Sequence, residues 1–460
     1  MTKNIILNVD SYKASHFKQY PPGTQVVSSY IESRGGKFDK SLFFGLQIFI
    51  KDWLKTPITQ ENIDEAEEVF TAHGDPFNRE GWEYILKVHK GYLPLIINAV
   101  PEGTVVPVKN ALLEVRNTDP NVPWLTSYVE TALLRAVWYP TTVATLSWNI
   151  KQVVIKALEK TAEKPMDSLG FMLNDFGSRG VSSYESSAIG GLAHLVNFSG
   201  TDNIPAIMAG RKYYGCTMAG YSIPAAEHST ITSWGKSNET EAYRNMLNQF
   251  KDGKILAVVS DSYDLENAVK NIWGKELKEE VINSGARVVI RPDSGDPCTM
   301  AISTVSWLMD AFGFSTNSKG FKVLPPYVRV IYGDGINLES IKEICEGFIH
   351  YKLSVENVCF GMGGGLLQQL DRDTMKFAMK TSAVMIDGVW RDVFKDPKTD
   401  PGKASKKGVQ DLYLDATGNY VTDCAKNAYK YKSRVMRCVY YDGGDRVNDT
   451  LQQIRERSVL

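Results

Sequence analysis

The residue of this chain best suited to chemistry is His228, in the segment GYSIPAAEHSTIT at residues 220–232. Ser229 and Thr230 follow it. Because both residue types accept bonds from free backbone N–H groups, we expect one of them to cap a helix that begins here. His228 would then be half exposed at this junction. Taken alone, the segment is more simply a capped helix with an incidental histidine, so its neighbours in the fold decide its role.

The elements that must position this histidine are short apolar runs that alternate with helical patterns after residue 166. The predicted strands are 170–175, 194–198, 254–260, 286–291, 328–332 and 356–360, with a less regular one near 216–223. The predicted helices are 182–193, 240–250, 264–273, 299–313 and 338–348. This alternation predicts a parallel sheet, and about seven successive units favour a (β/α) barrel. An open doubly wound sheet is the alternative, but no GxGxxG motif follows the first strand.

Polar residues and glycines stand where each predicted strand ends. They are Asp175, Phe176, Arg179, Asp202, His228, Asp261, Arg291, Asp293, Gly333, Asp334, Gly363, Gly364 and Gly365. In a parallel barrel these ends share one face, which is where active sites lie. Glycines before a helix expose backbone N–H groups to a phosphate, and carboxylates suit a divalent cation that holds phosphate oxygens. The pattern therefore predicts a barrel enzyme that acts on a phosphorylated small molecule.

The rest of the chain predicts a β-rich α+β domain made of residues 1–120 and 377–460, next to a barrel domain at 121–376. Its predicted strands are 4–9, 25–33, several short runs between 93 and 119, and the run 377–394. A polar helix is expected at 10–20 and helical segments at 62–90. Two long helices are expected at 122–137 and 141–163, with a break near Pro140. The lysine-rich loop at 395–407 is either solvated or a source of cations for a polyphosphate.

The composition narrows the class of protein. The chain has 460 residues, 43% of them hydrophobic, and a formal net charge of -1, so neither nucleic acid nor an anionic membrane is expected as a partner. None of the six cysteines forms a CxxC pair, and scattered thiols suggest a reducing compartment. The first residues lack an apolar signal region, and no run approaches the ~20 apolar residues of a membrane span. We expect a cytoplasmic protein.

Eight strings of this sequence resemble the type II phosphoribosyltransferases that act on pyridine bases. They are DSYKASHFKQYPP, HLVNFSGTD, AAEHSTIT, VVSDSYD, IRPDSGDP, GDG, GGGLLQQLDRD and FKDPKTDP, and they extend from about Asp10 to Gly408. The resemblance implies an irregular α/β barrel with a β-rich domain, in a homodimer with shared active sites. It also implies a glycosyltransferase of NAD salvage, which makes nicotinamide mononucleotide and pyrophosphate from nicotinamide and phosphoribosyl pyrophosphate, with Mg²⁺ and with ATP as co-substrate.

The same resemblance implies roles for the matching residues. His228 would be phosphorylated by ATP, with Asp261 and Asp293 supporting the histidine and the metal or ribose. The nicotinamide ring would contact Phe176, Asp202 and Arg291, together with Tyr12 of the second subunit. The ribose 5-phosphate would contact Arg179, Gly333, Asp334, Gly363, Gly364 and Arg372. The pyrophosphate or ATP phosphates would contact Arg34, Lys380, Lys395 and Lys403.

Three alternatives remain at this point. The nearest is a nicotinate phosphoribosyltransferase, against which Asp202 argues, because its carboxylate would meet like charge on nicotinate. A barrel lyase or aldolase would need a strand-end lysine as a Schiff-base donor, and none of the seven ends has one. The third alternative is a binding protein with a vestigial site. It is disfavoured because the chain keeps the full set of site residues, namely His228, Asp261, Arg291, Asp293 and Asp334. The sequence departs from the family pattern at Ser178, Ala257 and Met362. These departures are expected to affect the contacts of the tunnel that holds the nicotinamide ring more than the reaction itself.

Overall fold

The computed structural model describes residues 3–396, 398–399 and 405–459, so Lys403 lies outside the described residues. The chain forms two compact units, which we call the barrel unit and the sheet unit. The barrel unit comprises Leu146–Arg211 and Thr217–Gln369, and the sheet unit comprises Met1–Thr145, Lys212–Cys216 and Leu370–Leu460. Helices α5 (Glu130–Thr161) and α8 (Ile204–Tyr214) contribute residues to both. Across the described ranges, no helix is long and apolar enough to cross a membrane.

The core of the barrel unit is a six-stranded parallel sheet in the order β7-β6-β13-β12-β9-β8. Its strands are β6 (Leu173–Asp175), β7 (Gly200–Thr201), β8 (Ile255–Val259), β9 (Arg287–Arg291), β12 (Val328–Tyr332) and β13 (Val358–Met362). Their runs, such as ILAVV and RVVIR, are rich in the β-branched residues that suit buried parallel strands. Two isolated bridges, Gly200 to Tyr221 and Ala225 to Ala257, link the two edges of the sheet. The sheet therefore curls into the irregular barrel that the family resemblance implies.

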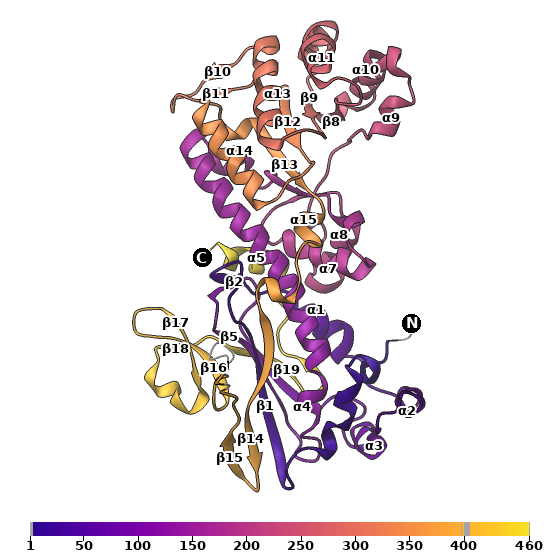
Figure 1. Cartoon of the computed structure of the whole chain (residues 1–460), viewed down its shortest axis with the longest axis vertical. Coiled ribbons are helices and arrows are strands. Elements are labelled where there is room, and N and C mark those ends of the chain that lie inside the picture. Colours follow the sequence, from indigo (N-terminus) through magenta and orange to yellow (C-terminus); the bar gives the residue numbers. More distant parts are fainter. Residues whose placement is uncertain (1–2, 397, 400–404, 460) are drawn as a thin grey trace. The chain divides into compact units, whose positions relative to one another are not determined.

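Helices cover the outside of this sheet, as α10, α11, α13 and α14 do around β8, β9 and β12 in Figure 1. The helices are α6 (Pro165–Leu169), α7 (Tyr184–His194), α9 (His228–Thr232), α10 (Glu239–Phe250), α11 (Leu265–Asn267), α12 (Lys278–Asn283), α13 (Pro297–Phe312), α14 (Leu338–His350) and α15 (Gly364–Leu367). A π-helix, Ala268–Glu276, continues α11, and the hairpin of β10 (Ser315–Thr316) and β11 (Lys322–Val323) follows α13. The five helices predicted between 182 and 348 are confirmed to within a few residues.

The sheet unit is built on a seven-stranded antiparallel sheet in the order β15-β14-β1-β5-β3-β19-β20. The strands are β1 (Thr24–Ser33), β3 (Leu95–Ala99), β5 (Ala111–Asn117), β14 (Phe377–Ile386), β15 (Val389–Asp392), β19 (Arg437–Tyr441) and β20 (Gly444–Asp445). Strand β1 pairs with β14, so the N-terminal and C-terminal parts of the chain share one sheet. The last seven of the ten residues of β1 are buried, and most of them are apolar or small.

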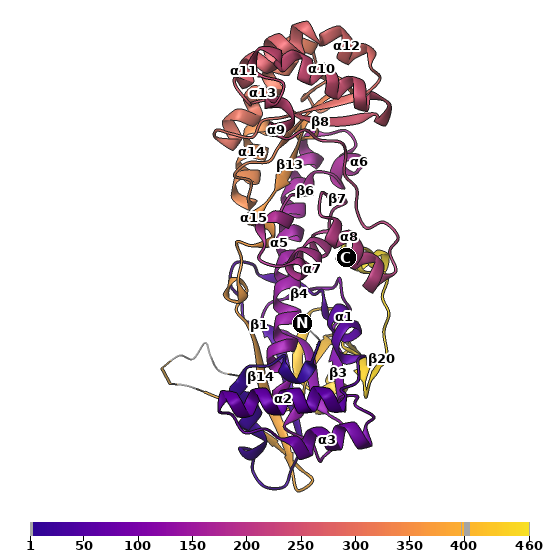
Figure 2. The same cartoon turned by 90° about the vertical axis from the view of Figure 1, so that its right-hand side faces the viewer.

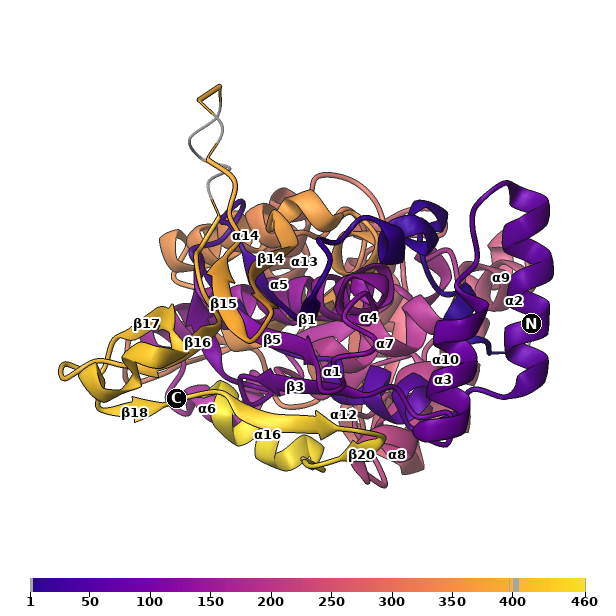
Figure 3. The same cartoon turned by 90° about the horizontal axis from the view of Figure 1, so that it is seen from below.

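Smaller elements complete the sheet unit. Strand β2 (Lys40–Leu42) pairs with β4 (Val105–Pro107), and β16 (Gln410–Leu414) lies between β17 (Tyr420–Cys424) and β18 (Ser433–Arg434). The helices are α1 (Leu46–Phe49), α2 (Gln60–His73), α3 (Arg79–Val88), α4 (Leu125–Tyr128) and α16 (Leu451–Ser458), with 3₁₀-helices η1 (Ile5–Leu7) and η2 (Ser11–Lys18). Figure 2 shows α2 and α3 lying side by side. Figure 3 shows the three-stranded sheet at one side of β5.

Two of the regular strand predictions, 4–9 and 194–198, are wrong. Residues 4–9 contain the 3₁₀-helix Ile5–Leu7 instead of a strand, because the Asn4 side chain accepts the Ile6 N–H at 3.0 Å and caps the turn. The run 194–198 is the end of α7 and the turn after it, while the strand itself is Gly200–Thr201. Leu195, Val196 and Phe198 are fully buried there. A short buried apolar run looks the same in a strand and at a helix end, so the pattern misleads.

The predicted break near Pro140 is also wrong, because α5 runs without interruption from Glu130 to Thr161. Packing explains why the helix continues through a proline. The Thr141 hydroxyl donates to the Phe44 carbonyl at 3.1 Å, and the Thr145 hydroxyl accepts the Leu42 N–H at 2.9 Å. Both threonines are buried. Tertiary contacts therefore hold the turns that follow Pro140. The irregular strand near 216–223 is likewise no strand, although Tyr221 makes one of the two edge bridges.

Candidate active site

The carboxyl ends of the parallel strands meet at one edge of the barrel and carry the predicted polar residues. Asp261 follows β8, Asp293 follows β9, and Asp334 follows β12. Neighbouring strands are in parallel register there, as when Val259 pairs with Arg291 on β9. The structure thus brings these ends together, as the strand pattern predicts.

His228 is the first residue of α9, and its side chain is 46% exposed. The expectation that Ser229 or Thr230 caps this helix is wrong. Glu227 is the capping residue, in a capping box in which Thr230 Oγ1 accepts the Glu227 N–H at 3.3 Å. The cap leaves the imidazole directed at the strand ends, where its Nδ1 lies 3.1 Å from the Ser262 hydroxyl.

Two carboxylates lie on the other side of the imidazole. Nε2 is 3.5 Å from Asp293 Oδ2 and 3.8 Å from Asp261 Oδ1. Asp261 is held firmly, because its Oδ2 accepts the Asp293 N–H at 2.9 Å and the Ser294 hydroxyl, and its side chain is only 4% exposed. A histidine flanked by carboxylates has one nitrogen held as a donor and the other available as a base or nucleophile.

Asp261 also has an oxygen that the fold does not use. Its Oδ1 is buried and has no hydrogen-bond partner among the described residues. Such an oxygen is costly unless a ligand or a cation takes it. Carboxylate oxygens are the ligands that Mg²⁺ prefers, so Asp261 and Asp293 fit that ion. No group of three or more His, Cys, Asp or Glu residues suited to a metal lies within the described ranges, so phosphate oxygens and water would complete its shell.

A cavity of about 680 Å³ opens inside the barrel and is lined by Phe176, Asp202 and Arg291 among others. The Phe176 ring rests on glycines: a Cβ at Gly361 would lie 2.1 Å from it, and one at Gly333 would lie 3.6 Å away. Gly361 is therefore required for the ring's position. Sequence analysis did not single it out, although it lies in the same FGMGGG string as Gly363, Gly364 and Gly365.

Asp202 is exposed and accepts the Ser222 hydroxyl. Asp202 does not cap the next helix, because α8 begins at Ile204 and the side chain of Asn203 accepts the Ala206 N–H at 3.2 Å. Asp202 is thus free to face the cavity that it lines.

A buried aspartate lies directly behind this wall. Asp175 Oδ1 accepts the Gly177 N–H at 2.7 Å, and Oδ2 accepts the Asn203 side-chain amide at 3.0 Å. Burial raises the pKa of Asp175 to about 6, with a further contribution from Asp202. Its bonds fix the turn that carries Phe176, whose own N–H donates to the Met362 carbonyl at 3.0 Å. Asp175 therefore positions the aromatic ring.

The predicted phosphate contacts divide between the two units. Arg179 lies exposed on a 3₁₀ turn, Ser178–Gly180, that packs against the glycine loop, where a Cβ at Gly180 would lie 3.3 Å from the Gly364 Cα. Asp334 is exposed at the end of β12. These residues share the barrel unit with Gly333, Gly363 and Gly364, whereas Arg372 belongs to the sheet unit.

The sheet unit holds the other predicted cations. Arg34 Nε and Nη2 are buried without a hydrogen-bond partner in the described part of the chain, although Nε lies 3.5 Å from Glu32. Burial lowers the pKa of Lys380. Glu130 opposes this shift, and the charges of Arg34, Lys395 and Lys13 add to it. Donors without acceptors and crowded positive charges are typical of a site for a polyanion. Tyr12, on η2, is also in this unit and is 57% exposed.

Comparisons with known proteins agree with this geometry. The profile described as the nicotinate phosphoribosyltransferase family matches residues 171–438, and the one described as the N-terminal domain of nicotinamide phosphoribosyltransferase matches residues 4–97. The nicotinamide phosphoribosyltransferase of Xanthomonas campestris pv. campestris is 55% identical over 91% of this chain and 89% of its own length. That of Acinetobacter baylyi is 32% identical over 98% and 96%.

Solved structures share the fold at low identity. The nicotinate-nucleotide pyrophosphorylase of Pyrococcus furiosus has a TM-score of 0.62 at 15% identity, covering 100% of this chain and 96% of its own. Human nicotinic acid phosphoribosyltransferase has a TM-score of 0.58 at 17% identity, covering 98% and 92%. The chain belongs to the nicotinate phosphoribosyltransferase family of pentosyltransferases. Within that family its relatives are the nicotinamide phosphoribosyltransferases, whose N-terminal domain it also carries.

Proposed function

We propose that this chain makes nicotinamide mononucleotide and pyrophosphate from nicotinamide and phosphoribosyl pyrophosphate, and that ATP drives the synthesis through a phosphohistidine at His228. The observation that carries the proposal is an exposed histidine whose Nε2 faces two carboxylates, next to a cavity with an aromatic wall. Arg291 links the two features, because it lines the cavity and lies 3.7 Å from Asp293 Oδ2.

The histidine step follows from the orientation of the ring. Asp293 and Asp261 face Nε2 at 3.5 and 3.8 Å, and their negative charge favours the tautomer with the proton on Nε2, which leaves Nδ1 with the free electron pair. Nδ1 attacks the γ-phosphorus of ATP, the bond from that phosphorus to the bridging oxygen breaks, and ADP leaves. In this tautomer the Ser262 hydroxyl, 3.1 Å away, would donate to Nδ1 until the phosphate arrives. Water later takes the phosphoryl group from the histidine, which restores the enzyme.

Transfer of the phosphoribosyl group needs positioning and charge more than a strong base. The nicotinamide ring nitrogen attacks C1 of the ribose while the bond from C1 to the pyrophosphate oxygen breaks. Stacking on Phe176 would place the ring nitrogen in line, which supplies much of the barrier reduction. Arg179 and the glycine loop would hold the 5-phosphate. Arg34, Lys380 and Lys395 would meet the negative charge of the pyrophosphate. Bound Mg²⁺ would add positive charge to phosphate oxygens, held by Asp261 or Asp293.

We also propose a homodimer with shared sites, in the cytoplasm. Tyr12 supports the first point, because an exposed aromatic side chain in the sheet unit matches a ring-stacking position of the family. Mixing Tyr12→Ala with His228→Ala subunits should restore activity, since a hybrid dimer has one site that lacks neither residue. A dead mixture, with hybrids shown to form, would contradict shared sites. The six free cysteines support the location.

The second candidate is nicotinate as the base. Asp202 favours nicotinamide, because an ionised carboxylate accepts a bond from the amide NH₂ and repels a carboxylate.

The test follows mononucleotide by chromatography with phosphoribosyl pyrophosphate, Mg²⁺ and either base, with and without ATP. We expect a nicotinamide product whose yield rises with ATP, with little nicotinate product. A preference for nicotinate would contradict the choice of base, and no product from either base would contradict the transferase.

A further inference from the structure

The side chain of Tyr12 lies exposed on η2, and the chain on both sides of it is fixed to the start of α5. On one side, Asp10 Oδ2 accepts the Thr131 hydroxyl at 2.7 Å, and the Asp10 N–H donates to the same hydroxyl at 3.2 Å. On the other side, Lys13 Nζ donates to Glu130 Oε2 at 2.7 Å. Tyr12 therefore projects from a backbone that is held by side-chain contacts before and after it.

The ammonium group of Lys13 is buried. The side chain of Lys13 is only 4% exposed, and that of its partner Glu130 is 29% exposed. Ser127 Oγ accepts a second, longer bond from the same ammonium group at 3.5 Å. Such a buried ion pair adds little to stability, because the loss of hydration offsets most of the attraction. What the pair does provide is a positive charge that is fixed in one place.

This fixed charge lies against the ring of Tyr12. Lys13 Nζ is 5.4 Å from the centre of the ring, which is within the range of a cation–π contact. The imidazole of His16 meets the same ring in a T-shaped contact, with 5.2 Å between the ring centres and 75° between the planes. Burial lowers the pKa of His16, the charge of Lys13 adds to this shift, and Glu130 opposes it. His16 is therefore neutral near pH 7, and Lys13 supplies the positive charge.

These contacts restrict the ring before a ligand arrives. Tyr12 is 57% exposed, and an exposed side chain without such neighbours changes rotamer freely. A ring that is already held loses less conformational entropy when a ligand stacks on it, so the ligand binds more tightly. The surroundings of Tyr12 are therefore those of a preformed stacking surface.

We propose that Lys13, held by Glu130, is a positioning residue that sets the ring of Tyr12 for stacking on the nicotinamide moiety. This inference rests on the proposed function, in which Tyr12 contributes to the site of the second subunit. Lys13 touches no substrate in this role and acts only through the Tyr12 ring. Its effect on the binding of the nicotinamide moiety must therefore disappear when that ring is absent.

A double-substitution cycle with the full chain tests this role, with calorimetry of nicotinamide mononucleotide as the measurement. Lys13→Met should raise the Kd ~5-fold, which is the usual size of one cation–π contact. Lys13→Arg should restore most of the affinity, because it keeps the charge. In the Tyr12→Ala background, Lys13→Met should have no further effect on the Kd. An equal loss in both backgrounds, or no loss in Lys13→Met, would overturn the proposal.

Lys18→Met is the matched control. Lys18 lies on the same 3₁₀-helix, and its Nζ is 5.5 Å from the centre of the adjacent Phe17 ring, but its side chain is exposed. Lys18→Met should leave the Kd unchanged, and a loss equal to that of Lys13→Met would overturn a role specific to Tyr12. If Lys13→Met does not fold, Lys13→Gln takes its place in the cycle, because it is neutral and still donates to Glu130.

Two results separate this inference from the proposed function. A chain that makes and binds the mononucleotide, but in which the effects of Lys13→Met and Tyr12→Ala simply add, contradicts only the role of Lys13. A chain that neither makes nor binds the mononucleotide contradicts the proposed function, and this inference with it.

Discussion

Two buried carboxylates, one in each unit, show opposite arrangements. In the barrel unit, Asp261 keeps one oxygen without a partner next to His228. In the sheet unit, Glu102 has both oxygens bonded: Oε1 accepts the N–H groups of Gly45 and Gln47 at 3.1 and 2.7 Å, and Oε2 accepts the Tyr214 hydroxyl at 2.8 Å. A carboxylate that the fold satisfies fixes the fold, and one that it leaves unsatisfied is available to a ligand.

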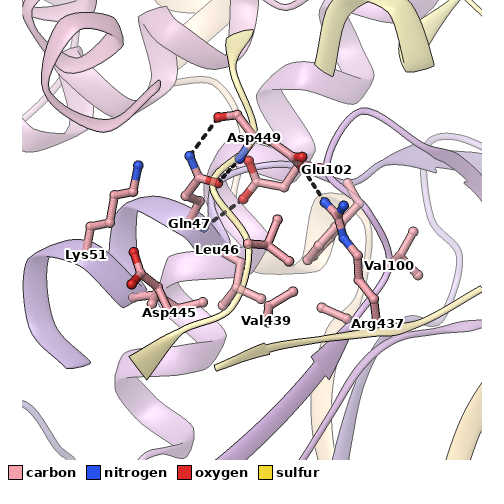
Figure 4. A pocket seen from close by; sticks show the side chains of 13 residues that line it. Leu46, Gln47, Lys51, Val100, Glu102, Arg437, Val439, Asp445 and Asp449 are labelled. Carbon is pink, nitrogen blue, oxygen red and sulfur yellow. Dashed lines mark hydrogen bonds and ion pairs between the residues drawn. The ribbon is translucent and has the colours of Figure 1, made fainter. Parts of the chain in front are cut away.

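The surroundings of Glu102 support its structural role (Figure 4). The Gln47 side chain donates to the Asp449 carbonyl at 3.0 Å and accepts the Asp449 N–H at 2.8 Å. Asp449 in turn accepts from Arg457 at 2.6 Å. The cavity among these residues has a volume of only about 20 Å³, which is room for one water molecule. The cluster therefore joins the start of α1 to the C-terminal segment and takes no substrate.

The largest effect is expected for a substitution in the barrel unit. His228→Ala should lower ATP-stimulated synthesis by ~10³-fold or more, because the nucleophile for ATP is removed. The free energy of unfolding should change by less than ~0.5 kcal/mol, since the side chain is half exposed and makes one hydrogen bond. Initial rates and urea unfolding measure the two quantities. Ser229→Ala, one residue away, is the control and should keep the rate.

The next largest effect is expected on the stability of the sheet unit. Glu102→Ala should destabilise the chain by ~3 kcal/mol, because buried donors at Gly45, Gln47 and Tyr214 lose their acceptor. The activity of the molecules that remain folded should stay near that of the unchanged chain. Chemical unfolding and an active-site titration measure these separately. A variant that is fully stable but inactive would reverse the roles assigned to the two carboxylates.

These particular residues show what sequence can predict. Asp261, Asp293 and Asp334 stand at strand ends, and parallel strands bring such ends together, so the sequence predicts their meeting. Gly361 and Asp175 act through packing and buried bonds, which no spacing reveals.

The sheet unit was predicted as a mixture of strands and helices. Its key cluster, however, joins Gln47, Glu102, Tyr214 and Asp449, which lie far apart in the chain. The prediction of a helix break near Pro140 failed for the same reason. Contacts of Thr141 and Thr145 with residues far away in the sequence keep α5 intact.

The pH dependence of stability sharpens the comparison. Burial raises the pKa of Glu102 from 4.5 to about 7, so the folded chain binds a proton there that the unfolded chain has lost. This contribution is fully present below pH 4.5 and is lost as the pH rises through about 7, with a total on the order of 3 kcal/mol. Glu102→Gln should remove this contribution, so the free energy of unfolding should change less between pH 5 and pH 8 than it does in the unchanged chain. Equal pH profiles for Glu102→Gln and the unchanged chain would contradict a protonated Glu102.

The smallest expected effect is on the choice of base. Asp202→Ser should narrow the preference for nicotinamide over nicotinate by ~10-fold, which corresponds to ~1.4 kcal/mol, because a charge that repels nicotinate is gone. The ratio of kcat/KM for the two bases measures it. Asp175→Asn is the comparison variant. It should lower kcat/KM for nicotinamide and for nicotinate by the same factor, because it loosens the turn that carries Phe176 without changing the charge at Asp202. A full preference retained in Asp202→Ser would remove Asp202 as the selector.

The central claim, that the unsatisfied strand-end site forms a phosphohistidine, has one direct measurement. The chain is incubated with ATP labelled in the γ-phosphate and Mg²⁺, and the protein-bound label is counted before and after brief acid treatment. We expect up to one acid-labile phosphate per chain, mapped by mass spectrometry to the peptide that contains His228 and absent from His228→Ala. Label on another residue, or equal label in His228→Ala, would contradict the claim.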